Sequence, residues 1–404
     1  MLLPCCIVFA SLLPIRAIPP AEMSPAAKKY LDAALDVIEK KSIRRDVDWS
    51  KMRSSAYAQV ADAQTPTDTY KGIRYALSFV NDGHSGFFTA KDMKEMDKGE
   101  ARSPGMMVLD CYVVKLAPGG PAEAAGLKLG MHVLQVNGQP VSDTPSFYDE
   151  YWKAMGQGDG RMTLLAEDRQ GKHASYTVIP GKTTVIVPPS GGRLDGGYGY
   201  INVQEFEGNS RLMRKYANQI QDLIRTTDAS DIKGWIVDLR LNGGGNMYPM
   251  IAGLGALFGD GDLGSFISST GADKWGYKKG SAIEGGHSVV GIRPYKLLHK
   301  GLPIAVLIAG PTASSGEAVA ISFIGLNKTV LVGGPTQGLT TANEFETLSD
   351  GTVINLCEAV EADRTGKKYG VPIRPEIFVR TSWAKYGTDE DPVVLAAKKW
   401  IDEQ

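Results

Sequence analysis

The chain has 404 residues, of which 43% are hydrophobic and 22% are charged, and its formal net charge is −1. This length predicts two or three globular domains. The balanced charge gives no strong field toward nucleic acid or an anionic membrane, so we expect neither as a partner. The 4 cysteines and 5 histidines are scattered without metal-ligand spacing. We therefore expect no metal site and no cofactor.

An apolar stretch occupies residues 2–15. Its length fits the apolar core of a secretory signal and is short for a membrane span. We therefore expect residues 1–21 to be a signal peptide, which predicts a secreted or periplasmic protein without a stable membrane anchor. No Lys or Arg precedes the stretch, which departs from the usual signal pattern. If the stretch is not a signal, the expected location is the cytoplasm.

Residues 22–103 are predicted to be helical. Ser24-Pro25 is a helix start signal, and apolar residues recur after it at helical spacing. A later helix is expected over residues 68–80, because an Asn-Asp-Gly stop signal follows it. His84 comes directly after that signal. A histidine between glycines just past a helix end is well placed to reach into a cleft.

Residues 104–183 change to short strands and turns, with a tight turn at Asn137-Gly138. The Pro-Ala to Gly-Leu stretch at 121–127, the segment 130–138 and a helix near 146–154 together resemble a PDZ domain. Met131 stands where that family usually has Asp. The resemblance implies peptide binding by strand addition to a sheet edge. The alternative is a small β domain that only braces its neighbour.

Residues 184–404 alternate buried strands with helices. Strands are expected at 234–239, 304–308 and 330–332, with helices between and after them. This rhythm predicts an α/β fold in which helices cover a largely parallel sheet.

Two loops that leave strands of this region carry candidate chemistry. One holds Gly243-Gly244-Gly245, whose amides can approach an anion because no side chain blocks them. The spacing fits neither a P-loop nor a dinucleotide fingerprint. The other loop reads Thr-Ala-Ser-Ser-Gly-Glu over residues 312–317. By itself, a serine there is most simply a helix cap.

The ordered motifs Asp-Leu-Arg-x-Asn-x-Gly-Gly (238–245), Thr-Ala-Ser-Ser-Gly-Glu (312–317), Val-Gly-x-Pro-Thr-x-Gly (332–338) and Leu-x-Asp-Gly (348–351) resemble the S41 family of serine peptidases. That family includes the carboxyl-terminal processing peptidases and their tricorn-core and chlamydial relatives. The resemblance implies an α/β, crotonase/Clp-protease-like ββα core with an N-terminal helical segment and an inserted PDZ-like domain. It also implies a polypeptide substrate.

By this resemblance Ser314 is the nucleophile. The amide of Ser315 and that of Gly243 or Gly244 would form the oxyanion hole.

The general base departs from the lysine-using branch of the family. Leu339 occupies the lysine position and cannot accept a proton. Residues 82–86, Asp-Gly-His-Ser-Gly, match the histidine segment of the other branch, so His84 is the predicted base. The alternative is a surface histidine in a glycine turn.

The group that would orient His84 is left open between Glu358 and Glu361, with Ser85 as a further helper. Two other functions also stay open. One is a catalytically inactive peptide-binding protein on the same scaffold, favoured by the missing lysine. The other is a hydratase or isomerase of the crotonase-like fold. The sequence predicts no oligomeric state.

Overall fold

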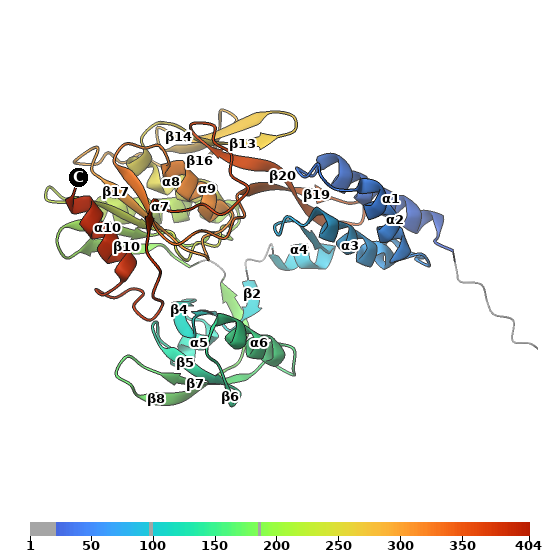
Figure 1. Ribbon diagram of the computed structural model, residues 1–404, viewed down its shortest axis with the longest axis horizontal. Coiled ribbons are helices and arrows are strands. Elements are labelled where there is room, and N and C mark those ends of the chain that lie inside the picture. Colours follow the sequence, from blue (N-terminus) through green and yellow to red (C-terminus); the bar gives the residue numbers. More distant parts are fainter. Residues whose placement is uncertain (1–21, 97–99, 185–186) are drawn as a thin grey trace, which may run out of the picture.

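The computed structural model describes residues 22–96, 100–184 and 187–404. The predicted signal peptide at 1–21 lies outside these residues. Figure 1 shows three parts: an N-terminal helical part, an inserted β domain and a larger α/β core. Within the described ranges, no helix is both long and apolar enough to cross a membrane.

The first helix begins and the third ends where the sequence predicts, although α3 begins at Tyr70 after a 3-10 turn and the predicted helical region also contains the short strands β1 and β2. The hydroxyl of Ser24 accepts the amide of Ala27 and caps the first helix. Asn81, with φ of 47°, ends the third helix in a left-handed conformation, and this turn leads into His84. The elements of this part are α1 (Pro25–Lys41), α2 (Trp49–Ala58), η1 (Pro66–Thr69), α3 (Tyr70–Val80), β1 (Gly86–Phe88) and α4 (Ala90–Met96).

The helical part shares its hydrophobic core with the end of the chain. Leu348, Ile354 and Leu356 are buried among the apolar faces of α1, α2 and α3. Strand β1 pairs antiparallel with the long strand β20 (Val353–Asp363). In Figure 1, β20 and its partner β19 (Thr341–Thr347) reach from the core to the helices. The His84 turn is therefore held against the core by backbone pairing.

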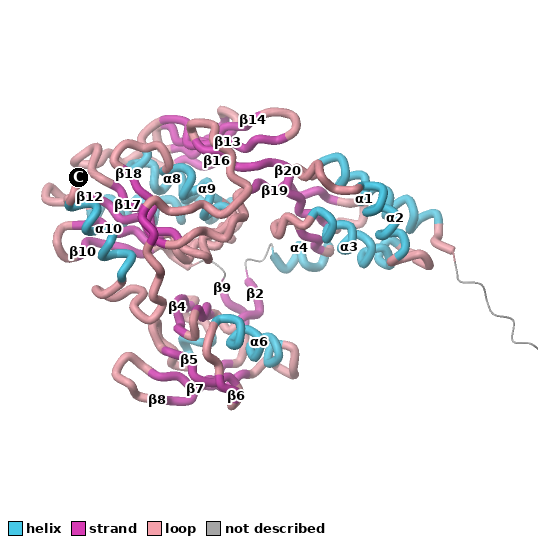
Figure 2. The backbone as a smooth tube through the Cα atoms, viewed as in Figure 1, coloured by secondary structure: helices cyan, strands magenta, loops and turns pink. Residues whose placement is uncertain are grey.

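The inserted domain is an antiparallel sheet with two helices, joined to the rest by the short β2–β9 ladder (Figure 2). Short strands occupy residues 106–109 and 112–116, and the predicted Asn137-Gly138 turn and the helix near residue 146 are present. The likeness to a PDZ domain stays a prediction. The elements are β2 (Glu100–Ser103), β3 (Met106–Leu109), β4 (Tyr112–Leu116), α5 (Pro121–Ala124), β5 (His132–Val136), β6 (Gln139–Pro140), α6 (Thr144–Met155), β7 (Met162–Glu167), β8 (His173–Val178) and β9 (Gly181–Thr184).

The predicted parallel sheet is the centre of the core. Its strand order is β10-β11-β12-β17-β18-β21, and every neighbouring pair from β11 onward is parallel. Every residue of β12 and β17 is buried, as expected for a sheet covered on both faces. Trp235 and Val237 face the cluster of α7, α8 and α9, whereas Ile236 faces α10. The elements are β10 (Ser190–Leu194), β11 (Tyr198–Asn202), α7 (Ser210–Thr227), β12 (Gly234–Asp238), α8 (Met247–Phe258), β17 (Ile304–Ile308), α9 (Ser315–Phe323), β18 (Thr329–Gly333), β21 (Ile377–Phe378) and α10 (Pro392–Asp402).

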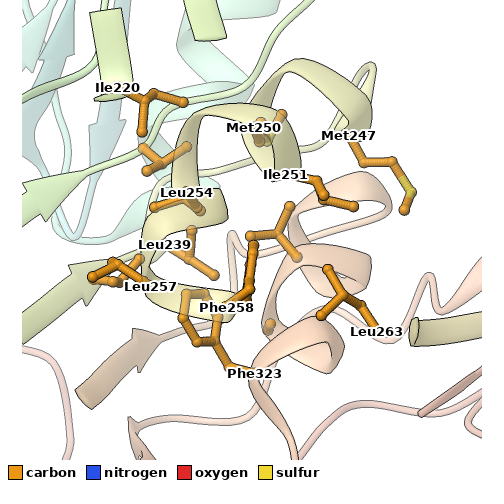
Figure 3. Packing of buried hydrophobic residues seen from close by; sticks show 14 of the residues in the cluster. Ile220, Leu239, Met247, Met250, Ile251, Leu254, Leu257, Phe258, Leu263 and Phe323 are labelled. Atoms are coloured by element: carbon orange, nitrogen blue, oxygen red, sulfur yellow. The ribbon is translucent and has the colours of Figure 1, made fainter. Parts of the chain in front are cut away.

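A second, antiparallel sheet encloses α8 and α9 from the other side, and the sequence reading did not predict it. Figure 3 shows apolar side chains of α8 packed toward α9, where the rings of Phe258 and Phe323 are 4.4 Å apart. Trp275 and Tyr277 of the second sheet complete this cluster. Besides β1, β19 and β20, the sheet contains β13 (Gly261–Ser268), β14 (Ala272–Lys278), β15 (Ser281–Glu284) and β16 (His287–Gly291).

Candidate active site

Ser314 lies in a strained turn between strand β17 and helix α9. Its φ and ψ are 50° and −125°, so a residue with a β carbon adopts a conformation that glycine favours. Such strain costs about 1–3 kcal/mol and persists only where the surroundings impose it, commonly at functional sites. A serine in a sharp strand-to-helix turn presents its hydroxyl at the end of the sheet. Ser314 is also the N-cap residue of α9, with a capping box to Glu317, and its strained backbone is the feature that an ordinary N-cap with extended backbone lacks.

The Glu317 carboxylate fixes the serine turn (residues 310–315) from inside. Its Oε2 accepts the amide of Ser314 at 3.1 Å. Its Oε1 accepts the amide of Gly338 at 2.9 Å and the hydroxyl of Thr336. Burial raises the pKa of Glu317, although these hydrogen bonds oppose the rise. One buried side chain thus ties the serine turn to the bridging segment (residues 336–341).

The glycine loop (residues 242–246) lies directly against Ser314. The backbone oxygen of Asn242 accepts the amide of Ala313 at 3.0 Å. Gly244 has φ of 114°, and a β carbon built on it would lie 2.8 Å from the β carbon of Ser314. The approach is so close that this position requires glycine.

The predicted oxyanion-hole amides differ in whether they already donate a hydrogen bond within the protein. The amide of Gly244 donates to Asn242 Oδ1 at 3.0 Å. The amides of Gly243 and Ser315 have no hydrogen-bond acceptor within the described chain. The hydroxyl of Ser315 donates to the backbone oxygen of Gly245 and joins the serine turn to the glycine loop. Gly243 and Ser315 are therefore the available donors.

His84 contacts the far end of the bridging segment and the strand that follows it. Its ring Nδ1 is 2.9 Å from Thr341 Oγ1, and its backbone oxygen accepts Asn343 Nδ2 at 2.8 Å. Burial lowers the pKa of His84, while the nearby Asp82 carboxylate opposes the shift. An imidazole with a lowered pKa is neutral near neutral pH, as a general base must be.

The described structure contains no hydrogen bond between His84 and Ser314. Both residues nevertheless border one segment of chain. The Leu339 side chain lies 3.8 Å from a β carbon built on Gly83, the residue before His84. The next amide back along the chain, that of Gly338, binds Glu317 beside Ser314. Leu339, where the resemblance implies a lysine in other family members, thus lies in the segment that both predicted catalytic residues border.

A small polar network supports Thr341 from behind. Cys357 Sγ lies 3.3 Å from Thr341 Oγ1 and donates to Asn343 Oδ1 at 2.9 Å. Burial raises the pKa of Cys357 to about 12, so the thiol is neutral. The amide of Cys357 donates to Ser85 Oγ at 3.0 Å. Sequence reasoning missed Thr341, because its contact with His84 depends on how β19 and β20 are placed beside the His84 turn.

Neither predicted glutamate hydrogen-bonds His84. Glu358 lies near Lys41 and two other strand glutamates, and burial raises its pKa. Glu361 is buried, and burial and the charge of Glu317 raise its pKa. The side-chain partner of the His84 ring is therefore Thr341. Within the described residues there is also no cluster of His, Cys, Asp and Glu that would hold a metal ion.

The inserted domain reaches this region through Lys115 of β4. Its ammonium group pairs with the carboxylate of Glu205 and donates to the backbone oxygen of Leu241 at 3.0 Å. Leu241 directly precedes the glycine loop. The inserted domain thus contacts the backbone beside the predicted oxyanion hole.

The α/β core is similar to proteins of a known family. Residues 197–378 match the model of peptidase family S41. Residues 197–378, most of the α/β core, are therefore similar to an S41 peptidase domain. Members of this family are serine-type peptidases. A nucleophilic serine in a strained strand-to-helix turn, as at Ser314, is consistent with that chemistry. A solved structure of a lipoprotein from Streptococcus agalactiae shares the fold of the S41 domain and its neighbours, with a TM-score of 0.59 at 18% identity over 97% of this chain and 99% of that chain.

Two named relatives extend the comparison in sequence. The nisin-resistance protein of Lactococcus lactis subsp. lactis is 34% identical over 212 residues, which cover 52% of this chain and 62% of that protein. The chloroplastic C-terminal processing peptidase of Tetradesmus obliquus is 23% identical over 364 residues, which cover 82% of this chain and 73% of that protein. The chain therefore spans less than two thirds of the length of the first relative and about three quarters of the second.

Proposed function

We propose that the protein is a serine endopeptidase that cleaves extended or C-terminal segments of polypeptides through an acyl-enzyme. Ser314 is the nucleophile and His84 the general base, as in the histidine-using branch of the family. The observation that carries the proposal is the strained Ser314 turn packed against Gly244. A catalytically inactive binding protein has no need to maintain such strain.

The proposed reaction begins when a peptide carbonyl enters between the serine turn and the glycine loop. His84 takes the hydroxyl proton of Ser314 as the oxygen attacks the carbonyl carbon. The negative charge that develops on the carbonyl oxygen is stabilised by the amides of Ser315 and Gly243. One such donor contributes about a hundred- to a thousand-fold to the rate. His84 then passes the proton to the leaving amine, and water releases the acyl group by the same steps.

Thr341 is the proposed orienting group for His84, in place of Glu358 or Glu361. A hydrogen bond at Nδ1 fixes the ring and leaves Nε2 to face the serine. A neutral hydroxyl stabilises the imidazolium less than a carboxylate does, so we expect a slower enzyme than one with a full acid–base–nucleophile triad. Because the described structure has no hydrogen bond between Ser314 and His84, we expect the two side chains to approach each other when substrate binds.

The inserted domain is the proposed first contact for substrate. A PDZ-like sheet edge would bind a polypeptide end as an added strand. We also infer from residues 2–15 that the protein acts outside the cytoplasm. Both points rest on sequence resemblance.

A serine-reactive fluorophosphonate tests the assignment. We expect wild-type protein to be labelled at Ser314, and Ser314→Ala to lose the label completely. His84→Ala should slow labelling strongly, whereas His287→Ala, which removes an exposed histidine of β16, should not. Wild-type protein should cleave unfolded casein, whereas Ser314→Ala should not. Equal labelling of wild type and Ser314→Ala would contradict the proposal.

A further inference from the structure

Glu361 is a buried carboxyl group for which the proposed mechanism has no use. Only 2% of the residue is exposed, and its Oε2 has no hydrogen-bond partner in the described structure. It lies on β20, where its amide donates to the backbone oxygen of Thr340 at 3.1 Å and its own backbone oxygen accepts the amide of Tyr369 at 2.9 Å. These backbone contacts hold the side chain in place beneath the bridging segment.

The charged neighbour of Glu361 is Glu317. The two residues contact the bridging segment at positions two residues apart: the Glu317 carboxylate accepts the amide of Gly338, and the backbone amide of Glu361 donates to Thr340. Both carboxyl groups are buried, and burial together with the negative charge of Glu317 raises the pKa of Glu361. From β13, Phe266 is opposite Glu361 and is apolar. From the segment behind it, the hydroxyl of Tyr369 donates to Asp363 instead.

Charging both buried carboxyl groups is costly, and the hydrogen bonds favour the charged form of one of them. Glu317 accepts two amides and a hydroxyl, and all three donors favour its charged form. Glu361 accepts no donor that would stabilise a charge. The hydrogen bonds thus favour a charged Glu317 and a neutral Glu361.

We propose that Glu361 is a positioning residue: it stays protonated, so that the neighbouring Glu317 keeps its charge and continues to hold the amide of Ser314. This inference rests on the proposed function of Ser314. If Glu361 loses its proton, Glu317 must take one up or be repelled. Either event weakens the hydrogen bond to Ser314 and releases the strained turn.

Infrared difference spectroscopy tests the proton directly, whatever the activity of the enzyme. Wild-type protein at neutral pH should show the C=O stretch of a protonated carboxylic acid, and Glu361→Gln should lack it. Glu344→Gln, which removes an exposed carboxyl group of β19, should keep the band. If wild type and Glu361→Gln have the same spectrum in this region, the inference is wrong.

The rate of fluorophosphonate labelling as a function of pH tests the consequence. Wild type should lose labelling on the alkaline side, by about tenfold per pH unit above the titration of Glu361. Glu361→Gln is neutral at every pH and should keep its rate there, while Glu344→Gln should follow wild type. An identical alkaline decline in Glu361→Gln would overturn the inference. Absence of labelling in every variant, wild type included, would instead contradict the proposed function and leave the infrared result to decide the proton.

Discussion

His84 Nδ1 lies 2.9 Å from Thr341 Oγ1, across 257 residues of sequence. Thr341 is two residues beyond Leu339, the position at which the lysine-using branch has its base. The predicted base therefore contacts the start of strand β19, just beyond the segment where the resemblance implies a lysine in other family members. Asn343, on the same strand, holds the backbone of His84. One strand therefore fixes both the ring and the main chain of the proposed base.

Thr341→Val removes the hydroxyl at nearly constant volume. We expect kcat to fall about five- to tenfold, because one neutral hydrogen bond contributes about 1 kcal/mol. KM should stay unchanged, since Thr341 orients the base and does not bind substrate. Steady-state kinetics on an unfolded protein substrate measures both constants. Thr341→Ser keeps the hydroxyl and should restore most of kcat; a Thr341→Val enzyme with wild-type kcat would show that the contact plays no part.

The pH dependence of activity should reflect the environment of His84. Burial lowers the pKa of His84, so the base stays neutral at pH values where an ordinary imidazole is already protonated. The acid limb of kcat/KM should therefore have its midpoint below about 6.5, the usual histidine value. Asp82 opposes this shift, so Asp82→Asn should move the midpoint further down. A midpoint above the usual value in wild type would contradict this reading.

The stability of the protein should follow the same group with a defined sign. Because the folded pKa of His84 lies below the unfolded one, the unfolded chain binds more protons as the pH falls through about 6.5. Folding stability is then lost on acidification between the unfolded and the folded pKa. His84→Gln should have a flatter dependence of melting temperature on pH in this window. Equal slopes in both proteins would mean that His84 has an ordinary pKa.

The sequence predicted the local parts of this site well. A buried strand, a small-residue loop and a buried helix place Ser314 at a strand-to-helix turn, and the stop signal after α3 places His84 just past a helix end. Such features depend on residues close together in sequence, whose conformational preferences are strong. The helices and the parallel strands are confirmed for the same reason.

The sequence did not predict the contacts between distant strands. The second sheet was missed because its strands lack a clear hydrophobic pattern. Gly264, for example, is needed in β13 only because the ring of Trp275 lies opposite it in β14: a β carbon built on Gly264 would lie 2.2 Å from that ring. The partners of Thr341 and Glu361 likewise depend on the pairing of β19 and β20. Pairing register is a property of the folded chain that alternation alone does not specify.

Comparing substitutions at Gly244 and Gly243 tests whether the glycine loop needs glycine for close packing or only for flexibility. Gly244→Ala places a methyl group on the Ser314 side chain in a backbone region that alanine avoids. We expect a loss of about 2–4 kcal/mol of unfolding free energy, from strain and overpacking together. Fluorophosphonate labelling should fall below detection. Gly243 has open space around its α carbon, so Gly243→Ala should melt at the wild-type temperature; similar melting of both variants would contradict the role of close approach.

The ion pair of Lys115 and Glu205 joins the inserted domain to the backbone before the glycine loop, and both side chains are at most 19% exposed. Lys115→Met leaves Glu205 without its partner and Leu241 without its donor. We expect a loss of about 2–3 kcal/mol, at the low end for a buried pair that loses one member. Activity should fall as well, because the position of Gly243 depends on the same backbone. Chemical denaturation and kcat/KM measure the two effects.

Three further variants identify the source of that loss. Lys115→Arg keeps the charge and should retain most of the stability, whereas Lys128→Met, at an exposed lysine of the same domain, should change neither quantity. The double variant Lys115→Met/Glu205→Gln should lose less than the sum of the two single changes, because the second substitution removes the charge that the first left unpaired. Strict additivity in this cycle would mean that the two side chains do not interact, and the inserted domain would then contact the glycine loop without stabilising it.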